Sequence, residues 1–510
     1  MKIDHKRGIR MPIRIIISAI LLLVQLSALF AFFFNLSVHS TGVFTISTAL
    51  GMLMVIYIVN RRGNPSYKIA WIIFILLFPI FGISVFLLWG GGRVLPHNRR
   101  KMEKCEANYF PYLKTDEETK NKLCYFDISH SRQADYLTHE SGFPIYDGTS
   151  SEFLSPGEKF FPRFLEELRQ AEKYIFIEFF ILAEGEMWDE IFEILKEKAK
   201  SGVEVKIIFD DFGSIKRQRK GFLKRVRNAG IGISVFNPIK PSFNMFMNNR
   251  NHRKIVVIDG KVALTGGINI GDEYINRIER FGHWLDCGII IKGKAVSSFT
   301  VMFLSMWEFT TGEMLDAKSY LTDYSVDAEG FVIPYSDDPL NDRNPAEGIY
   351  MQILNSAQKY VYIATPYLII DSSMISTLKM AAKSGVDVRI ITPHIPDKKY
   401  VHPVTQYNYL ELLESGIRIY EYLPGFVHSK YFVSDDKIAT VGTINMDYRS
   451  FILHFECGVW INDNSTVADI KEDFEQTLSK CKEITLEEWQ HRPLLSRLKE
   501  AALHIFAPFM

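Results

Sequence analysis

The sequence predicts a mixed α/β protein built from two similar mixed-sheet units in a pseudo-twofold arrangement, preceded by an N-terminal transmembrane helical region. Three observations favour this fold class. The chain of 510 residues begins with three long apolar runs. The rest repeats one series of segments in the same order, and within each copy short β-rich runs alternate with helical patterns. We expect five regions: residues 1–92 (membrane anchor), 93–150 (linker or small subdomain), 151–325 (first unit), 326–482 (second unit) and 483–510 (C-terminal amphipathic tail).

The apolar runs at the front are Ile13–Phe34, Val43–Val59 and Ile69–Trp89. As helices, the first and third are long enough to cross about 30 Å of hydrocarbon, and the second is marginal. The first run follows a basic start, as a secretory signal peptide does, but it is too long for one and no small-residue cleavage site follows it. We therefore expect an uncleaved membrane anchor.

The distribution of Lys and Arg predicts how this anchor is oriented. Residues 1–14 and the segment between the second and third runs are basic, which places both on the cytoplasmic side. A third complete span would put the basic residues from Arg93 onward outside. Pro79 and Gly82 lie near the middle of the third run, so we expect this run to bend and return. The sequence thus predicts a multi-pass cell-membrane protein with its large body on the cytoplasmic face.

The body is acidic overall. Of the 59 basic and 59 acidic residues, eight basic and one acidic lie in residues 1–90, which leaves the remainder with a net charge of −7. This balance disfavours a nucleic-acid-binding protein. The five cysteines are scattered and form no C-x-x-C pair, so we expect neither a disulfide framework nor a cysteine metal site.

The body is also an internal duplication. For example, Lys200-Ser-Gly-Val-Glu-Val resembles Lys383-Ser-Gly-Val-Asp-Val. Helical spacing and β-branched or aromatic runs predict the elements of each copy. The expected helices are Phe161–Glu172, Trp188–Ser201 and Met374–Ser384, and the expected strands are Tyr174–Leu182, Val203–Phe209, Ile255–Ile258, Val386–Ile391 and Lys430–Val433. Two short strands, Tyr125–Ser129 and Phe143–Tyr146, are expected before them. Because similar units favour a pseudo-twofold pairing, we expect the functional site at the seam.

One motif, H-x-K-x4-D-x6-G-x2-N, occurs twice with identical spacing. Its residues are His252, Lys254, Asp259, Gly266 and Asn269 in the first copy and His428, Lys430, Asp435, Gly442 and Asn445 in the second. The run between Lys and Asp suits a strand, in which a His and a Lys two positions apart face the same side. Each unit therefore presents one imidazole and one ammonium group to a common cavity.

Two imidazoles, two ammonium groups and two amides around one centre suit a phosphodiester substrate. One imidazole attacks phosphorus to give a covalent phosphohistidine, and the other protonates the departing alkoxide. Lysine is suited to phosphate oxygens, and amides add neutral donors. The predicted catalytic residues are His252, Lys254, Asp259, His428, Lys430 and Asp435, and the predicted substrate-binding residues are Asn269 and Asn445. We expect no metal and no cofactor, because a His-x-Lys pair lacks metal-ligand spacing.

Several carboxylates near the motifs are candidates for supporting roles. Asp286 and Glu456 follow the two motifs at matched positions, and we expect them to orient the histidines. A surface or structural role is the alternative. Although they belong to the motif, Asp259 and Asp435 are expected to fix the turn after the strand by accepting backbone hydrogen bonds. Glu178, inside an apolar strand, is a further candidate for lining the pocket.

Two segments are candidates for contact with a membrane surface. One is a basic cluster, for which a solvated helix face is the alternative. The other, Arg492–Met510, has apolar residues at helical spacing and either lies on the membrane or caps the core, which we favour. The basic cluster comprises Lys216, Arg217, Arg219, Lys220, Lys224, Arg225 and Arg227.

The duplicated motif resembles the signature of the phospholipase D superfamily over residues 150–480. With the apolar front and the segment Arg61-Arg-Gly-Asn-Pro-Ser-Tyr-Lys, the chain is similar to the bacterial cardiolipin synthases of that superfamily. The resemblance implies phospholipase D-like units and condensation of two phosphatidylglycerol molecules into cardiolipin and glycerol, with no metal required. It also implies a phosphatidyl-histidine intermediate, with His252 as nucleophile and His428 as acid and base.

Other functions stay open at this point. A hydrolytic phospholipase D, or another phosphatidyltransferase of the superfamily, would carry the same motifs. A membrane-bound nuclease of the superfamily is disfavoured by the acidic body. A non-catalytic membrane scaffold would tolerate the loss of either motif histidine. The sequence makes no prediction about the oligomeric state.

Overall fold

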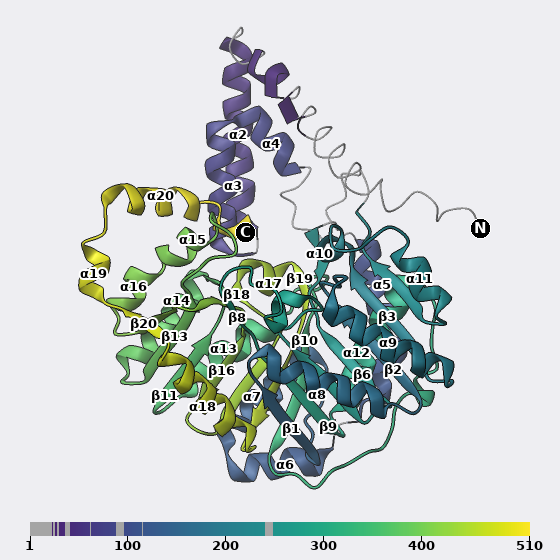
Figure 1. Ribbon diagram of the computed structural model, residues 1–510. Helices are drawn as coiled ribbons and strands as arrows, with labels where there is room; N and C mark the ends of the chain where they lie inside the picture. Colours follow the sequence, from purple (N-terminus) through teal and green to yellow (C-terminus); the bar gives the residue numbers. More distant parts are fainter. Residues whose placement is uncertain are drawn as a thin grey trace.

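The computed structural model describes residues 23, 26–27, 30–35, 41–61, 63–87, 96–114, 116–239 and 248–509 (Figure 1). Most of the first apolar run lies outside these residues. The second run forms helix α2 (Thr41–Asn60), and the third forms helices α3 (Pro65–Leu77) and α4 (Pro79–Val85). Within the described ranges, none of the helices combines the length and the apolarity needed to span a bilayer.

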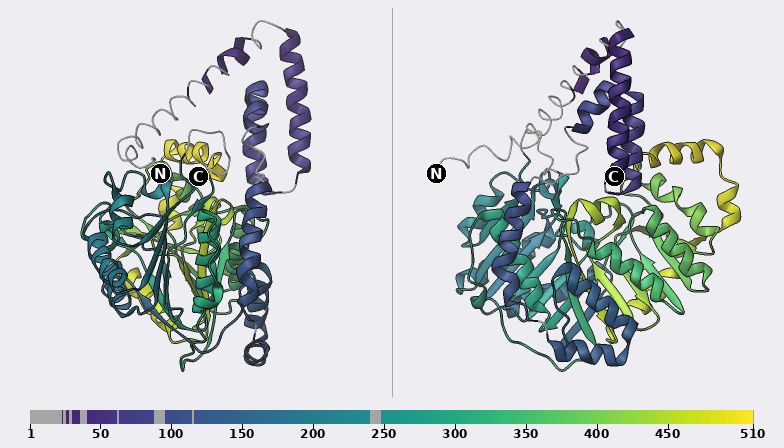
Figure 2. Two further views of the ribbon diagram at one scale, coloured as in Figure 1. Left: turned by 90° about the vertical axis from the view of Figure 1, so that its right-hand side faces the viewer. Right: turned by 180° about the vertical axis from the view of Figure 1, so that it is seen from behind.

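The third apolar run is bent, as the sequence predicts. Phe78 leaves the helical region between α3 and α4, because the proline that follows it disfavours a helical conformation. Helix α4 then packs back against α3, where a Cβ added to Gly82 would lie 2.8 Å from Ile75 Cα. Helices α2, α3 and α4 project together from one end of the body (Figure 2).

Helices occupy most of the described residues between 96 and 141, which corrects the strand predicted at Tyr125–Ser129. The helices are α5 (Pro96–Tyr109), η2 (Phe110–Tyr112), α6 (Glu117–Phe126) and α7 (Ile128–Ser141). Asp116 and Asp127 cap α6 and α7 by accepting hydrogen bonds from backbone amides. These caps stabilise the helices more than the short aromatic run between them favours a strand. The second predicted strand, Phe143–Tyr146, contributes an isolated bridge between Tyr146 and Val332.

The first unit is a seven-stranded mixed sheet with the order β1-β9-β7-β6-β2-β3-β4. Strands β2, β3 and β4 are parallel, and the others pair antiparallel. The strands are β1 (Thr149–Leu154), β2 (Tyr174–Phe179), β3 (Glu204–Asp210), β4 (Gly232–Phe236), β6 (Ile255–Ile258), β7 (Val262–Gly266) and β9 (Gly288–Gly293). The helices are α8 (Gly157–Gln170), α9 (Glu186–Lys200), α10 (Asp211–Ser214), α11 (Phe222–Asn228), η4 (Asp272–Ile275), α12 (Val296–Thr311) and η5 (Ala317–Ser319).

The second unit repeats this sheet strand for strand, with the order β10-β19-β17-β16-β11-β13-β14 and one added edge strand, β20. The strands are β10 (Phe331–Asp337), β11 (Tyr360–Ala364), β13 (Asp387–Pro393), β14 (Arg418–Tyr422), β16 (Tyr431–Ser434), β17 (Ile438–Gly442), β19 (His454–Asn462) and β20 (Cys481–Ile484), with β12 (Leu368–Ile369) and β18 (Met446–Asp447) paired separately. The helices are α13 (Pro345–Ser356), α14 (Ser372–Lys383), α15 (His402–Tyr407), α16 (Tyr409–Leu413), α17 (Tyr448–Ile452) and α18 (Thr466–Leu478). The matching orders confirm the duplication.

The apolar core lies in three layers. The central layer fills the space between the two sheets and contains α12 and α18. The duplication is visible in its packing, because Phe176 of β2 stacks on Phe303 of α12 and Tyr362 of β11 stacks on Phe474 of α18. The outer layers lie under α8 and α9 in the first unit and under α13 and α14 in the second. This packing holds the two sheets in one body.

Two short strand pairs tie the units together crosswise. Strand β5 (Arg250–Asn251) of the first unit pairs with the start of β19 in the second. In the mirror arrangement, β15 (Gly425–Val427) of the second unit pairs with β8 (His283–Leu285) of the first. Each bridging strand runs directly into a motif histidine. The crossed pairs therefore place both histidines at the seam.

The C-terminal tail folds as α19 (Leu486–Gln490), α20 (Leu494–His504) and η6 (Ala507–Phe509). Helix α20 contacts α15, where His504 stacks on Tyr407 with 4.0 Å between ring centroids. It lies at the same end of the body as α2, α3 and α4 (Figures 1 and 2). Five large apolar side chains of this tail stay exposed: Leu494, Leu495, Leu498, Ile505 and Phe506.

Candidate active site

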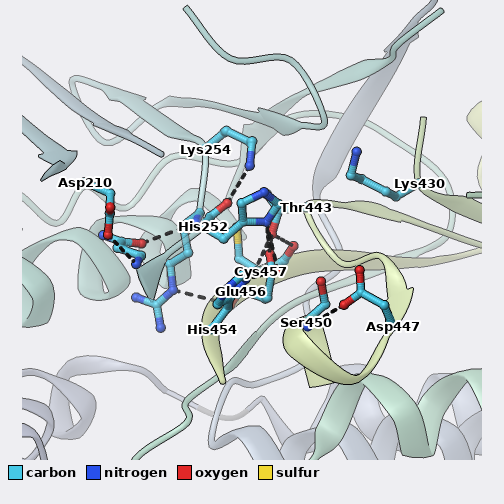
Figure 3. Close-up of polar contacts among 12 residues, drawn as sticks. Asp210, His252, Lys254, Lys430, Thr443, Asp447, Ser450, His454, Glu456 and Cys457 are labelled. Atoms are coloured by element: carbon cyan, nitrogen blue, oxygen red, sulfur yellow. Dashed lines mark hydrogen bonds and ion pairs between the residues drawn. The ribbon is translucent and has the colours of Figure 1, made fainter. Parts of the chain in front are cut away.

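His252 is held by residues of the second unit. Its backbone amide donates to the Phe455 carbonyl at 2.9 Å, at the point where β5 meets β19. Its Nδ1 lies 2.8 and 2.9 Å from the two carboxylate oxygens of Glu456 (Figure 3). Because a carboxylate accepts hydrogen bonds, this contact places the ring proton on Nδ1 and leaves a lone pair on Nε2.

His428 is held in the same way by the first unit. Its amide donates to the Leu285 carbonyl at 2.6 Å, and its Nδ1 lies 2.6 Å from Oδ2 of Asp286. The matched carboxylates thus contact the histidines as predicted, and the pairing is crosswise: each unit supplies one imidazole and the carboxylate for the other imidazole. Both rings are nearly buried, with 7% of His252 and 8% of His428 exposed.

The motif lysines flank the two imidazoles. Lys254 Nζ donates to the His252 carbonyl at 2.6 Å, and Lys430 Nζ donates to the His428 carbonyl. Burial lowers the pKa of Lys254 to about 7 and that of Lys430 to about 8. An ammonium group has three donors, so each lysine keeps two for a bound anion.

Burial also sets the charge of the histidines and of one carboxyl. It lowers the pKa of His252 and of His428 well below 6.5, and the neighbouring lysines lower both pKa values further. Burial raises the pKa of the Asp286 carboxyl to about 7. Because Asp286 and His428 share a short hydrogen bond, they titrate as a pair that keeps a proton close to neutral pH. His252 is neutral there, as a nucleophile must be.

The two carboxylates have different neighbours, although their positions match. Thr443 Oγ1 donates to Oε2 of Glu456. The equivalent position in the first unit is Gly267, where an added Cβ would collide with Oδ1 of Asp286 and lie 2.8 Å from the His428 carbonyl oxygen. Neither residue was predicted from the sequence, although each directly follows a motif glycine, a position that marks it as a neighbour of the site.

A third imidazole, also missed from the sequence, lies beside His252. The ring centroids of His454 and His252 are 5.5 Å apart, and His454 Nδ1 is 3.7 Å from Oε1 of Glu456 (Figure 3). Neither ring nitrogen of this buried side chain makes a hydrogen bond within the part of the chain that the structure describes. Burial lowers the pKa of His454 to about 4, so its ring is neutral at neutral pH.

The motif aspartates lie at the far ends of their strands from the histidines. Each accepts three backbone hydrogen bonds of 2.7 to 2.9 Å that fix the start of a neighbouring strand. This placement corrects their inclusion among the catalytic residues and agrees with the predicted turn role. Asp259 accepts from the amides of Glu172, Lys173 and Tyr174, and Asp435 accepts from those of Gln358, Lys359 and Tyr360.

Asp259→Asn should therefore affect folding more than chemistry. The amide puts an NH2 group against backbone N–H donors, while Asn still tolerates the φ of 55° at this position. We expect a loss of about 1–3 kcal/mol in the free energy of unfolding, measured by urea denaturation, with Asp323→Asn as an exposed control. A stable variant that has lost its activity would instead put the Asp259 carboxylate in the reaction.

The motif asparagines and Glu178 have distinct surroundings. Asn269 accepts a hydrogen bond from the Ile181 amide at 2.9 Å and donates one to Tyr274 Oη at 2.9 Å. Its side chain therefore links the segments that carry Ile181 and Tyr274. Asn445 Oδ1 is buried and accepts no hydrogen bond from the described residues. Glu178 is fully buried and accepts a hydrogen bond at 2.8 Å from Nδ2 of Asn251, the residue before His252.

The basic cluster is partly neutralised by ion pairs. Arg217 lies 2.5 Å from Glu273, and Arg225 pairs with Glu184. These contacts reduce the charge that this surface offers to anionic headgroups. They favour a solvated surface for the two paired arginines, of which Arg225 lies in α11 and Arg217 in the segment before it.

Comparison with known proteins agrees with this arrangement. The family described as "Cardiolipin synthase, PLD-like domain" matches residues 164–307 and 350–478. A second family, described as "Phospholipase_D-nuclease N-terminal", matches residues 49–91.

Similar proteins cover nearly the whole chain. A protein of Geobacillus sp. named cardiolipin synthase is 35% identical over 89% of this chain and 91% of its own length. Cardiolipin synthase 2 of Bacillus anthracis is 34% identical over 92% and 91%, and an uncharacterised protein of Streptococcus mutans is 42% identical over 89% and 99%. A crystal structure of phosphatidylserine synthase from Haemophilus influenzae shares the fold, with a TM-score of 0.55 and 17% identity over 75% of this chain and 98% of that one.

Proposed function

The chain belongs to the cardiolipin synthases with a PLD-like domain, and we propose that it joins two phosphatidylglycerol molecules into cardiolipin and glycerol through a phosphatidyl-histidine. One observation carries the mechanism: each motif histidine is held at Nδ1 by a carboxylate of the other unit. That contact directs both Nε2 atoms away from their carboxylates, as an in-line pair of nucleophile and acid requires.

In the first step, Nε2 of His252 attacks the phosphorus of one phosphatidylglycerol. The bond from phosphorus to the glycerol headgroup breaks, and His428 gives its proton to the departing oxygen. Lys254 and Lys430 hold the phosphate oxygens as negative charge builds up on them. The products of this step are free glycerol, a phosphatidyl group on His252 and a His428–Asp286 pair that has lost one proton.

In the second step, a headgroup hydroxyl of another phosphatidylglycerol attacks the same phosphorus. His428 takes the hydroxyl proton, and the bond from phosphorus to His252 breaks. Cardiolipin leaves, and both histidines return to their starting protonation states. We assign the acid role to His428 because the Asp286 pair keeps a proton near neutral pH, whereas His252 is neutral there.

The same groups give an expected pH profile. The pKa of His252 lies below 6.5, so protonation stops the attack only on the acid side of that value. Loss of the proton from the Asp286 pair and loss of the lysine charges both act from about pH 7 to 8 upward. We expect kcat/KM for phosphatidylglycerol to be bell-shaped, with its alkaline limb starting in that range. A flat profile between about pH 5 and 9 would argue against paired acid and base roles.

Product analysis tests the proposed reaction against hydrolysis. Purified enzyme and headgroup-labelled phosphatidylglycerol should give cardiolipin and free glycerol in equal amounts on thin-layer chromatography. Phosphatidic acid as the main product would identify a hydrolytic phospholipase D instead. The nearly complete burial of both imidazoles supports transfer, because a site closed to water favours the second lipid over hydrolysis.

We further infer that the enzyme is membrane-associated through its N-terminal region as a multi-pass anchor, with the body on the cytoplasmic face. The match of residues 49–91 to the N-terminal family and the insoluble substrates support the association. Helix α3 of this region contacts the body, since its N-cap residue Asn64 donates a hydrogen bond to Asp371 at 3.0 Å.

The exposed thiol of Cys124 reports the side on which the body lies. An impermeant maleimide should label Cys124 only after the cells are permeabilised, and Cys124→Ser should remove the label. Labelling of intact cells would place the body outside.

A further inference from the structure

The cluster formed by His252, His454 and Glu456 has the composition of a metal site. One ligand atom from each of the three residues lies within 4.8 Å of the other two, and all three side chains are buried. Two histidines and a glutamate also make up the protein ligands of several zinc enzymes, which leave a fourth position open. The three residues come from both units, and Figure 3 shows them converging.

His454 is the observation that points to a ligand. Its ring is at least nine-tenths buried, yet neither nitrogen makes a hydrogen bond within the described part of the chain. Burying a polar group without a partner costs free energy, so such a group is expected to face a water or an ion. Its Nδ1 is directed at Oε1 of Glu456 from 3.7 Å, which is too long for a hydrogen bond.

The distances suit a small ion after modest adjustment. Ligand atoms at about 2.1 Å from a tetrahedral Zn²⁺ lie about 3.4 Å from one another. Oε1 of Glu456 lies 2.8 Å from His252 Nδ1 and 3.7 Å from His454 Nδ1, on either side of that value. The other carboxylate oxygen is fixed by Thr443, which orients the ligand as an outer-shell hydrogen bond does in known sites.

We propose that His252, His454 and Glu456 bind a divalent transition-metal ion such as Zn²⁺, and that this ion inhibits the enzyme reversibly. The metal takes the Nδ1 lone pair of His252, and the single proton of the neutral ring moves to Nε2. An Nε2 that carries a proton has no lone pair with which to attack phosphorus. The ion replaces the hydrogen bond to Glu456 and blocks the reaction, so it is an inhibitor and not a cofactor.

Metal binding can be measured without substrate. The full-length enzyme is stripped with a chelator and titrated with Co²⁺, whose visible absorption reports four-coordinate ligation, and Zn²⁺ is then used to displace it. We expect His454→Asn and His454→Gln to weaken binding at least about tenfold. His139→Asn, which alters an exposed histidine, should bind as the parent does. Equal binding by the parent and by a folded His454 variant, as judged by thermal unfolding, overturns the site.

Inhibition is measured separately and rests on the proposed role of His252. We expect Zn²⁺ to stop cardiolipin formation by the parent and a chelator to restore it. Each variant is compared with its own metal-free activity, and the Zn²⁺ concentration for half-inhibition should rise at least about tenfold in His454→Asn. Unchanged half-inhibition, or binding without inhibition, overturns the inhibitory role. Because the Co²⁺ titration needs no turnover, failure of the reaction scheme would leave its result intact.

Discussion

Replacing His252 with Asn is expected to lower cardiolipin formation by at least about 10⁴-fold, because the variant cannot form the covalent intermediate. His428→Asn should be similarly slow with phosphatidylglycerol, since glycerol is a poor leaving group without a proton. His139→Asn, on an exposed histidine, is the control. The measurement is initial rate with labelled phosphatidylglycerol on purified protein.

A substrate with a better leaving group separates the two histidines. In a phosphatidyl ester of p-nitrophenol, the leaving group p-nitrophenolate departs without needing a proton. The variant His428→Asn should therefore regain the first step and release p-nitrophenolate in a burst. His252→Asn should release none. A burst from His252→Asn but not from His428→Asn would reverse the two roles. Full activity of either single variant with phosphatidylglycerol would contradict the role proposed for the replaced histidine.

The second large effect is expected for Glu456→Gln, about 10²–10⁴-fold in kcat. The glutamine side chain is nearly isosteric, but it no longer fixes the proton on His252 Nδ1 or stabilises the charged ring. Glu456 belongs to the second unit, whereas the histidine that it contacts, His252, belongs to the first. Glu475→Gln, on an exposed glutamate of the same unit, should leave kcat unchanged.

The crosswise pairing is tested by combining variants. If Glu456 acts through His252, the double variant His252→Asn/Glu456→Gln should be no slower than His252→Asn alone. Asp286→Asn should behave likewise with His428→Asn. Additive losses in these pairs would mean that the carboxylates act on something other than the imidazoles they contact.

The sequence predicted the duplicated sheets and singled out the two carboxylates that contact the motif histidines, because these features repeat along the chain. Strand and helix patterns recur in order, and Asp286 and Glu456 occupy the same place in each copy. The sequence did not predict which carboxylate contacts which histidine. That choice depends on the pairing of β5 with β19 and of β8 with β15, which join residues far apart in the chain and leave no local signal.

Differences between the copies were not predicted either. Thr443 and Gly267 occupy equivalent positions but only Thr443 supports its carboxylate, and His454 has a role only because β19 starts beside His252. The motif itself misled in one respect. Asp259 and Asp435 recur at the same distance in sequence from the motif histidines. They nevertheless bind backbone amides at the far ends of the strands. Belonging to the motif therefore did not establish a part in the chemistry.

The most direct measurement of the central claim is the site of the covalent intermediate. The enzyme is mixed with phosphatidylglycerol for a single turnover and quenched in alkaline detergent, because a phosphorus–nitrogen bond is labile in acid. Mass spectrometry of the peptides should then find the phosphatidyl group on His252, decaying as cardiolipin appears. A group found on His428 alone, or on neither histidine while cardiolipin forms, would contradict transfer through His252.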